Sequence, residues 1–123
     1  MSRKKKKAEY EKYDESQFIG KTVIIGITYK YKNDRLLGQE QFWGKIVAFN
    51  EKDGLKVDMK HSGEIGYFPP FFELMEILKP GVYTLRSTGE EVEDPDYAYK
   101  LIHNTKDPED VEKWAEYNKS KEL

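Results

Sequence analysis

The stretch Val23-Ile24-Ile25-Gly26-Ile27-Thr28-Tyr29-Lys30-Tyr31 decides the fold. Apolar residues fall on one parity of this stretch, and small or polar residues occupy the other, apart from Ile24. That period of two, in β-branched and aromatic residues, is typical of a strand with one buried face. Gly26 removes a side chain in mid-strand, which usually marks a bend or a close backbone approach. The stretch therefore predicts a bent strand that opens a small β-barrel.

More strand-like segments follow this one, separated by turn signals. Residues 33–39 are polar and predict an exposed loop, while 41–49 is apolar on both parities. Asp53-Gly54 predicts a hairpin into the alternating segment 55–59. A short strand over 64–68 ends at Pro69-Pro70, because proline cannot donate to a β-ladder. A 3₁₀ turn and a closing strand are expected over 71–78. This order predicts a mainly β protein with an SH3-like or Sm-like small barrel.

The rest of the chain predicts a second β meander and a terminal helix. The meander turns at Pro80-Gly81 and Thr88-Gly89-Glu90 and ends in the alternating segment 97–101. Asp107-Pro108 supplies an N-cap with proline at the first helical position. A short N-terminal helix is also expected within 8–17. The predicted organisation is a disordered basic arm (1–7), a single β-barrel domain (8–106), and a C-terminal helix and tail (107–123).

Composition limits the function classes. The 123 residues include no cysteine, which excludes disulfides, thiolate metal sites and a cysteine nucleophile. No apolar run approaches membrane-spanning length, so the sequence predicts a soluble, cytoplasmic protein without membrane contact. Net charge is −2, unevenly spread: the arm is strongly basic, whereas residues 89–123 hold five lysines against eleven carboxylates.

Familiar catalytic and metal-binding patterns are missing from the sequence. His61 and His103 each stand alone, and the hydroxyl and carboxylate near His61 lie in one predicted tight turn. Catalytic partners normally converge from separate elements. The acidic run over 90–96 does not have calcium-loop spacing, and no glycine-rich phosphate loop is present. We therefore expect a protein that is not an enzyme and has no cofactor or metal.

Aromatic residues are the most informative candidates for a binding site. They are too numerous for one face of a small core, and several flank the proline pair. Exposed aromatics beside a proline turn can form a groove for an extended or proline-rich peptide. The competing interpretation is that these rings fill the core in place of Leu and Val. The hypothetical groove consists of Trp43, Tyr67, Phe68, Phe71 and Phe72.

The basic arm is a second candidate, for nucleic acid. Its cations could bind phosphates without sequence preference. The body of the chain has no basic surplus, however, so a solubilising tail is favoured over a nucleic-acid contact. The residues concerned are Arg3, Lys4, Lys5, Lys6 and Lys7.

Several segments together resemble a known family. They are the opening strand, Gly44-Lys45-Ile46, the Gly63-Glu64 turn, the proline pair, and the run from Pro80 to Glu90 that leads to Asp94-Pro95-Asp96-Tyr97. From about Gly20 to Tyr97 the chain resembles a family of uncharacterised small bacterial proteins with an SH3-like small β-barrel. The resemblance implies no activity and assigns no functional residue.

The leading functional hypothesis is a non-enzymatic protein-binding module that uses exposed aromatics near Pro69-Pro70. Its expected partner is another protein or peptide, with a second copy of the chain as a further option. One alternative is an Sm-like nucleic-acid-binding protein, favoured by the strand order and the basic arm. Another is an immunity-type inhibitor that covers a toxin with the acidic C-terminal half.

Overall fold

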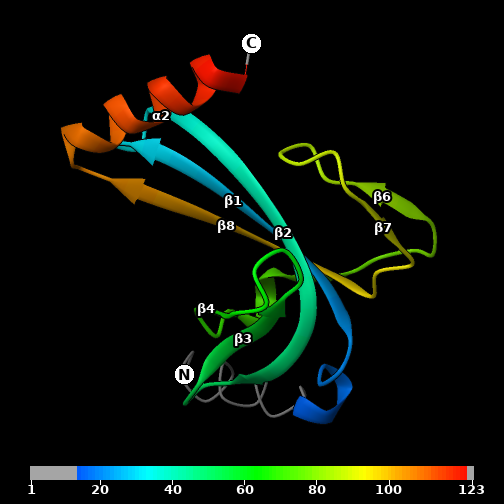
Figure 1. The fold of residues 1–123 in the computed structure, drawn as a ribbon. Helices are drawn as coiled ribbons and strands as arrows, with labels where there is room; N and C mark the ends of the chain where they lie inside the picture. The colour runs from blue at the N-terminus through cyan, green and yellow to red at the C-terminus, as the bar shows by residue number, and fades with distance from the viewer. Residues whose placement is uncertain (1–13, 122–123) are drawn as a thin grey trace.

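A computed structural model describes residues 14–121 (Figure 1). In this part of the chain, eight strands form two sheets, and one α-helix follows them. The protein is therefore mainly β with a C-terminal helix, as predicted. The elements are η1 (Glu15–Gln17), β1 (Thr22–Tyr31), β2 (Arg35–Asn50), β3 (Gly54–Met59), β4 (Ile65–Phe68), η2 (Phe72–Leu74), β5 (Met75–Ile77), β6 (Val82–Thr84), β7 (Glu91–Glu93), β8 (Tyr97–Thr105) and α2 (Pro108–Lys121).

The larger sheet has the strand order β4-β3-β2-β1-β8-β5, with β1 near its centre. Strand β1 runs antiparallel to β2 and parallel to β8, which enters the sheet between β1 and β5. Val23 and Ile25 of β1 are fully buried, as the alternation of the opening stretch predicts. The parallel pairing of β8 leaves no signal in the sequence, because it joins segments about 75 residues apart in the chain.

Strand β2 is long and strongly curved (Figure 1). Residues 35–45 of β2 pair with β1 and residues 44–50 pair with β3, with a register shift in the β3 pairing between Ile46 and Ala48. The exposed loop predicted for residues 33–39 is wrong, because β2 begins at Arg35 after a turn in which Lys32 and Asn33 have positive φ. The segment is polar because it is a strand with a solvent-facing side, not because it lacks regular structure.

The main core lies inside the curve of the large sheet. Phe68 of β4 packs 6.3 Å, ring centre to ring centre, from Tyr99 of β8, although three strands separate β4 from β8 in the sheet. The Tyr99 hydroxyl donates a 2.6 Å hydrogen bond to the carbonyl of Pro69. The sheet therefore curls enough to bring β4 and β8 to opposite sides of one core. The buried core consists of Phe18, Val23, Ile25, Ile46, Phe49, Leu55, Val57, Met59, Phe72 and Tyr99.

The β6–β7 hairpin forms the second sheet and covers part of the outer face of the first (Figure 1). Ile24, the apolar residue on the wrong parity of the opening stretch, is buried there with Leu85 and Val92. Trp43 packs against the same cluster. The parity break at Ile24 is therefore the contact point for a second, smaller core.

Helix α2 crosses the far ends of β1 and β2 (Figure 1). Asp107 caps it by accepting a 3.0 Å hydrogen bond from the Glu109 N–H, so the predicted start of this helix is confirmed. The Trp114 ring lies so close to Gly38 that a Cβ on this glycine would be 2.4 Å from it. Asn118 donates a 3.0 Å hydrogen bond to the Leu37 carbonyl. These contacts fix the helix on β2.

The predicted N-terminal helix is wrong within the described residues, where only the 3₁₀ turn η1 forms. The turn η1 does not continue as a helix, because Phe18 is buried in the core and the Gly20 N–H donates a hydrogen bond to the Ile46 carbonyl. Residues 8–13 of that prediction and the basic arm 1–7 lie outside the described residues. Between residues 14 and 121, no helix combines the length and apolar character that crossing a bilayer requires.

Candidate functional site

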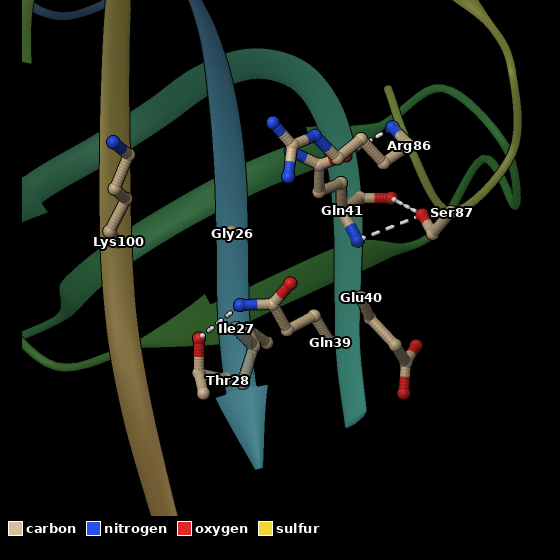
Figure 2. Close-up of a pocket in the computed structure, with 9 residues that line it drawn as sticks. All are labelled: Gly26, Ile27, Thr28, Gln39, Glu40, Gln41, Arg86, Ser87 and Lys100. Atoms are coloured by element: carbon tan, nitrogen blue, oxygen red, sulfur yellow. Dashed lines mark hydrogen bonds between the residues drawn. The ribbon is translucent and has the colours of Figure 1, made fainter. Parts of the chain in front are cut away.

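A hollow of about 510 Å³ lies on the outer face of the large sheet, beside the second core. Its floor is formed by β1, with β8 on one side and β2 on the other (Figure 2). The loop after β6 supplies the last part of its wall. The lining residues are Gly26, Ile27, Thr28, Gln39, Glu40, Gln41, Arg86, Ser87 and Lys100.

Gly26 creates the hollow by lacking a side chain. It pairs with Gln41 of β2 and with Lys100 of β8, so these three residues form one row across the outer face. The preceding row is covered by the hairpin through Ile24 and Trp43, whereas the Gly26 row is open. No neighbouring backbone requires a glycine at this position, since a Cβ there would meet only Lys100 Cγ, at 3.7 Å.

Two cations flank Gly26 from opposite sides. Lys100 rises from β8, and the Arg86 side chain extends from the hairpin loop across β2 (Figure 2). Both side chains are exposed, and within residues 14–121 neither forms a salt bridge. Glu40 also borders the hollow, but its side chain points away from Gly26 in Figure 2. The open part of the hollow is therefore electropositive in a chain whose net charge is negative.

The loop that carries Arg86 is attached firmly to β2. Ser87 Oγ accepts a 3.0 Å hydrogen bond from the Gln41 N–H and donates a 3.2 Å hydrogen bond to the Gln41 carbonyl. The Arg86 N–H donates a further short hydrogen bond to Gln41 Oε1. Ser87 thus occupies the β2 edge as a neighbouring strand would, and the backbone position of Arg86 is set by three hydrogen bonds to one residue.

Neutral polar groups complete the hollow. Gln39 Nε2 donates a 3.3 Å hydrogen bond to Thr28 Oγ1 across β1 and β2 (Figure 2). These two residues form the row next to Gly26, so hydroxyl and carboxamide groups lie beside the two cations. A guanidinium pairs with a carboxylate in bidentate geometry, and an ammonium adds a point charge. The arrangement fits an anionic group that is held by Arg86 and Lys100.

No family model matches the chain, and no curated protein or solved structure matches it either. What the hollow binds has therefore to be inferred from its own side chains.

The structure divides the five residues of the predicted aromatic groove among three places. Phe72 is buried and Phe68 is half-buried in the main core, whereas Trp43 packs in the second core. Tyr67 and Phe71 are 68% and 41% exposed, on either side of the proline pair. One ring of each adjacent pair is therefore more exposed than the other; for Tyr67 and Phe68 of β4 this follows from strand geometry, whereas Phe71 and Phe72 lie at the start of η2. A binding role for the two exposed rings stays a prediction.

The histidines and carboxylates that sequence analysis considered are also placed. His61 stacks on Phe42 with ring centres 4.9 Å apart, and His103 meets Tyr29 edge-on at 5.6 Å. Burial, with a further contribution from the nearby Glu40 carboxylate, raises the pKa of Tyr29 to about 12. Within residues 14–121, no three His, Asp or Glu side chains come close enough together to hold a metal ion.

Sequence reasoning missed Arg86, Ser87 and Lys100 as site residues. Lys100 lies in an alternating strand, and Arg86 lies at the end of a hairpin strand, so both look like ordinary solvent-facing cations. The parallel β1–β8 pairing brings Lys100 to Gly26, and the Gln41–Ser87 contact brings Arg86 there. Gly26 was the one available signal, since a glycine in a strand of β-branched residues requires an explanation.

Proposed function

We propose that this protein is a non-enzymatic protein-binding module that holds an acidic side chain of its partner in the hollow over Gly26. The observation that carries the proposal is the convergence of Arg86 and Lys100, neither in a salt bridge within residues 14–121, on a sheet position without a side chain. Exposed ion pairs are individually weak, about 0.2–1 kcal/mol. The hollow and its neutral donors must therefore contribute shape and further hydrogen bonds.

The binding scaffold is an SH3-like barrel in this proposal. Four antiparallel strands, a 3₁₀ turn and a fifth strand follow one another in the expected order, β1 to β4, η2 and β5. The chain departs from the simplest form of that barrel because β8 lies between β1 and β5. This insertion supplies Lys100, so the departure and the proposed site have the same origin.

Charge favours a protein partner over nucleic acid. Phosphate backbones are usually bound by a continuous basic surface on a basic domain. Here the net charge is −2, and the hollow offers two cations with an acidic hairpin beside it. A single carboxylate matches two cations better than a run of phosphates does. Salt dependence separates the two cases, because a phosphate binder loses affinity steeply with added salt.

Tyr67 and Phe71 form a second candidate contact on the same module. The Pro69 carbonyl between them accepts hydrogen bonds from the Tyr99 hydroxyl at 2.6 Å and from the Phe71 N–H at 2.9 Å. The segment is therefore held rigidly, which reduces the entropy lost when a peptide binds. Since β4 is an edge strand, an extended peptide could also pair with its backbone.

Peptide display tests the proposal and distinguishes the two surfaces. Peptides selected on the intact protein should share an aspartate or glutamate at a fixed position. Their binding should weaken about tenfold in a variant with both Arg86→Gln and Lys100→Gln, which corresponds to about 1.4 kcal/mol. The matched control is Lys45→Gln with Lys52→Gln, because it removes the same charge at exposed positions outside the hollow.

If the control variant also loses binding, the loss is explained by the change in net charge, and the hollow has no specific role. Binding that survives in the hollow variant but fails after Tyr67→Ser with Phe71→Ser would move the partner site to β4. Selection of proline-rich peptides without acidic residues would have the same meaning.

A further inference from the structure

A second, smaller pocket of about 110 Å³ lies on the other side of the Gln41–Ser87 contact from the hollow. It lies at the free edge of β2, along the part of the strand between its pairing with β3 and its contact with α2. Helix α2, the turn after β3 and the loop after β6 all contribute to it. Its ring-bearing lining residues are Phe42, Trp43, His61 and Tyr117, and its carboxylates are those of Glu40 and Glu90.

Four of the nine lining residues carry aromatic rings, and each ring is fixed by its own contacts. The Phe42 ring is stacked on His61, with their planes 22° apart. Trp43 is held in the second core. Tyr117 of α2 meets the Trp114 ring edge-on at 5.1 Å. The wall is therefore assembled before any ligand arrives.

The charge in this pocket is the opposite of the charge in the hollow. Glu40 and Glu90 supply carboxylates, and no lysine or arginine is among the lining residues. Glu90 is set by a tight turn in which the Gly89 N–H donates to the Leu85 carbonyl and the Leu85 N–H donates to the Glu90 carbonyl. Arg86, the nearest cation in sequence, extends into the hollow instead (Figure 2).

Trp43 adds an unsatisfied donor to this region. Its Nε1 is the one buried side-chain nitrogen or oxygen within residues 14–121 that makes no hydrogen bond. Buried donors are nearly always paired, and leaving one unpaired costs stability. Because this nitrogen is enclosed by the protein, its N–H reports on a ligand in the pocket and does not contact the ligand itself.

We infer that this pocket binds an alkylammonium group, with aromatic rings beside the methylenes or methyls and carboxylates near the charge. Rings around a cation attract it through their quadrupoles, most strongly when the site excludes water, and quaternary ammonium ligands are recognised in this way. The volume matches a short alkyl chain with its headgroup, since it equals about four water molecules. The inference does not depend on what the hollow binds.

Titration of the ¹⁵N-labelled protein with choline tests the inference. Its neutral isostere, 3,3-dimethylbutan-1-ol, has the same shape without the charge. Choline should shift the indole N–H of Trp43 and the backbone amide of Thr88 saturably, and the indole N–H of Trp114 should move less. The alcohol should bind at least about tenfold more weakly.

Two variants assign the effect to the carboxylates. Glu90→Gln should weaken choline about threefold while leaving the alcohol unchanged, and adding Glu40→Gln should weaken it further. Glu91→Gln is the matched control, because this exposed neighbour does not line the pocket. Glu90 and Glu91 are exposed and Glu40 is partly buried, so circular dichroism of each variant should first show that its fold is unchanged.

A capped peptide with one trimethyllysine is the second probe, and it distinguishes a partner's side chain from a free small amine. Saturable binding of either probe at Trp43 supports the inference. Equal affinity for choline and its neutral isostere would overturn it, since the pocket would then be merely apolar. Absence of binding by both cationic probes would overturn it as well.

Discussion

Two glycines of the large sheet, Gly26 and Gly44, should respond to alanine in opposite ways. A Cβ on Gly44 would lie 2.1 Å from the Asp58 carbonyl oxygen and 2.9 Å from Val57 Cγ1. The first of these atoms belongs to the backbone of β3, so it cannot move aside without disturbing the sheet. A Cβ on Gly26 would meet only Lys100 Cγ, at an ordinary 3.7 Å.

The expected magnitudes follow from these contacts. Gly44→Ala should lower the free energy of unfolding by about 3 kcal/mol, at the upper end of the usual cost of overpacking. Gly26→Ala should raise it by about 0.4–1 kcal/mol, because alanine restricts the unfolded chain and meets no obstacle in the folded one. At about 4 °C per kcal/mol, the two melting temperatures should differ by about 15 °C.

Urea unfolding followed by circular dichroism measures both changes. The wild-type protein is the reference, and equal m-values would show that the variants unfold from the same compact state. A Gly44→Ala variant as stable as wild type would refute the account of β2 as a strand closely packed on β3. A Gly26→Ala variant that loses more than about 1 kcal/mol would show that the floor of the hollow is not open.

Four further outcomes are expected. Gly38→Ala should displace the Trp114 ring and cost about 1–3 kcal/mol, and unchanged near-ultraviolet circular dichroism would contradict that contact. Ile25→Ala should cost about 2–5 kcal/mol and Thr28→Ala well under 1 kcal/mol, so equal costs would contradict a buried inner face at Ile25 and an open outer face at Thr28. Tyr99→Phe should cost about 1 kcal/mol through its lost hydrogen bond to a proline carbonyl, as measured by urea unfolding. Burial raises the pKa of Tyr99 from 10.0 to about 12, so its contribution to stability should be complete below pH 10 and disappear as pH rises through 12. If Tyr99→Phe removes a group that ionises near pH 10 from the tyrosinate absorbance titration, this expectation is contradicted.

Local patterns predicted much of the fold. The strand over Val23–Tyr31, the turn at Asp53-Gly54 and the cap at Asp107 each depend on neighbouring residues, and each is present in the structure. The first half of β2 was missed because its polarity resembles that of a loop. A strand that faces solvent on one side and has a free edge has no continuous apolar pattern to reveal it.

Most of the candidate site could not be predicted from the sequence, because its residues come together only through long-range pairing. Lys100 reaches Gly26 through a parallel strand pair, and Arg86 reaches it through the Gln41–Ser87 hydrogen bonds. Exposed cations at these two positions carry no local sign of their common location. The aromatic residues illustrate the same limit, since alternation predicts that one ring of the Tyr67–Phe68 pair points outward but not what lies beside it.

Backbone amide shifts on addition of a selected acidic peptide test the central claim most directly. If the hollow holds the acidic group, the largest shifts in the ¹⁵N spectrum should occur at Gly26, Thr28, Ser87 and Lys100. They should shrink about tenfold at equal peptide concentration in Gly26→Val, whose side chain fills the floor without straining β1. Largest shifts along β4, or unchanged binding in Gly26→Val, would contradict the claim.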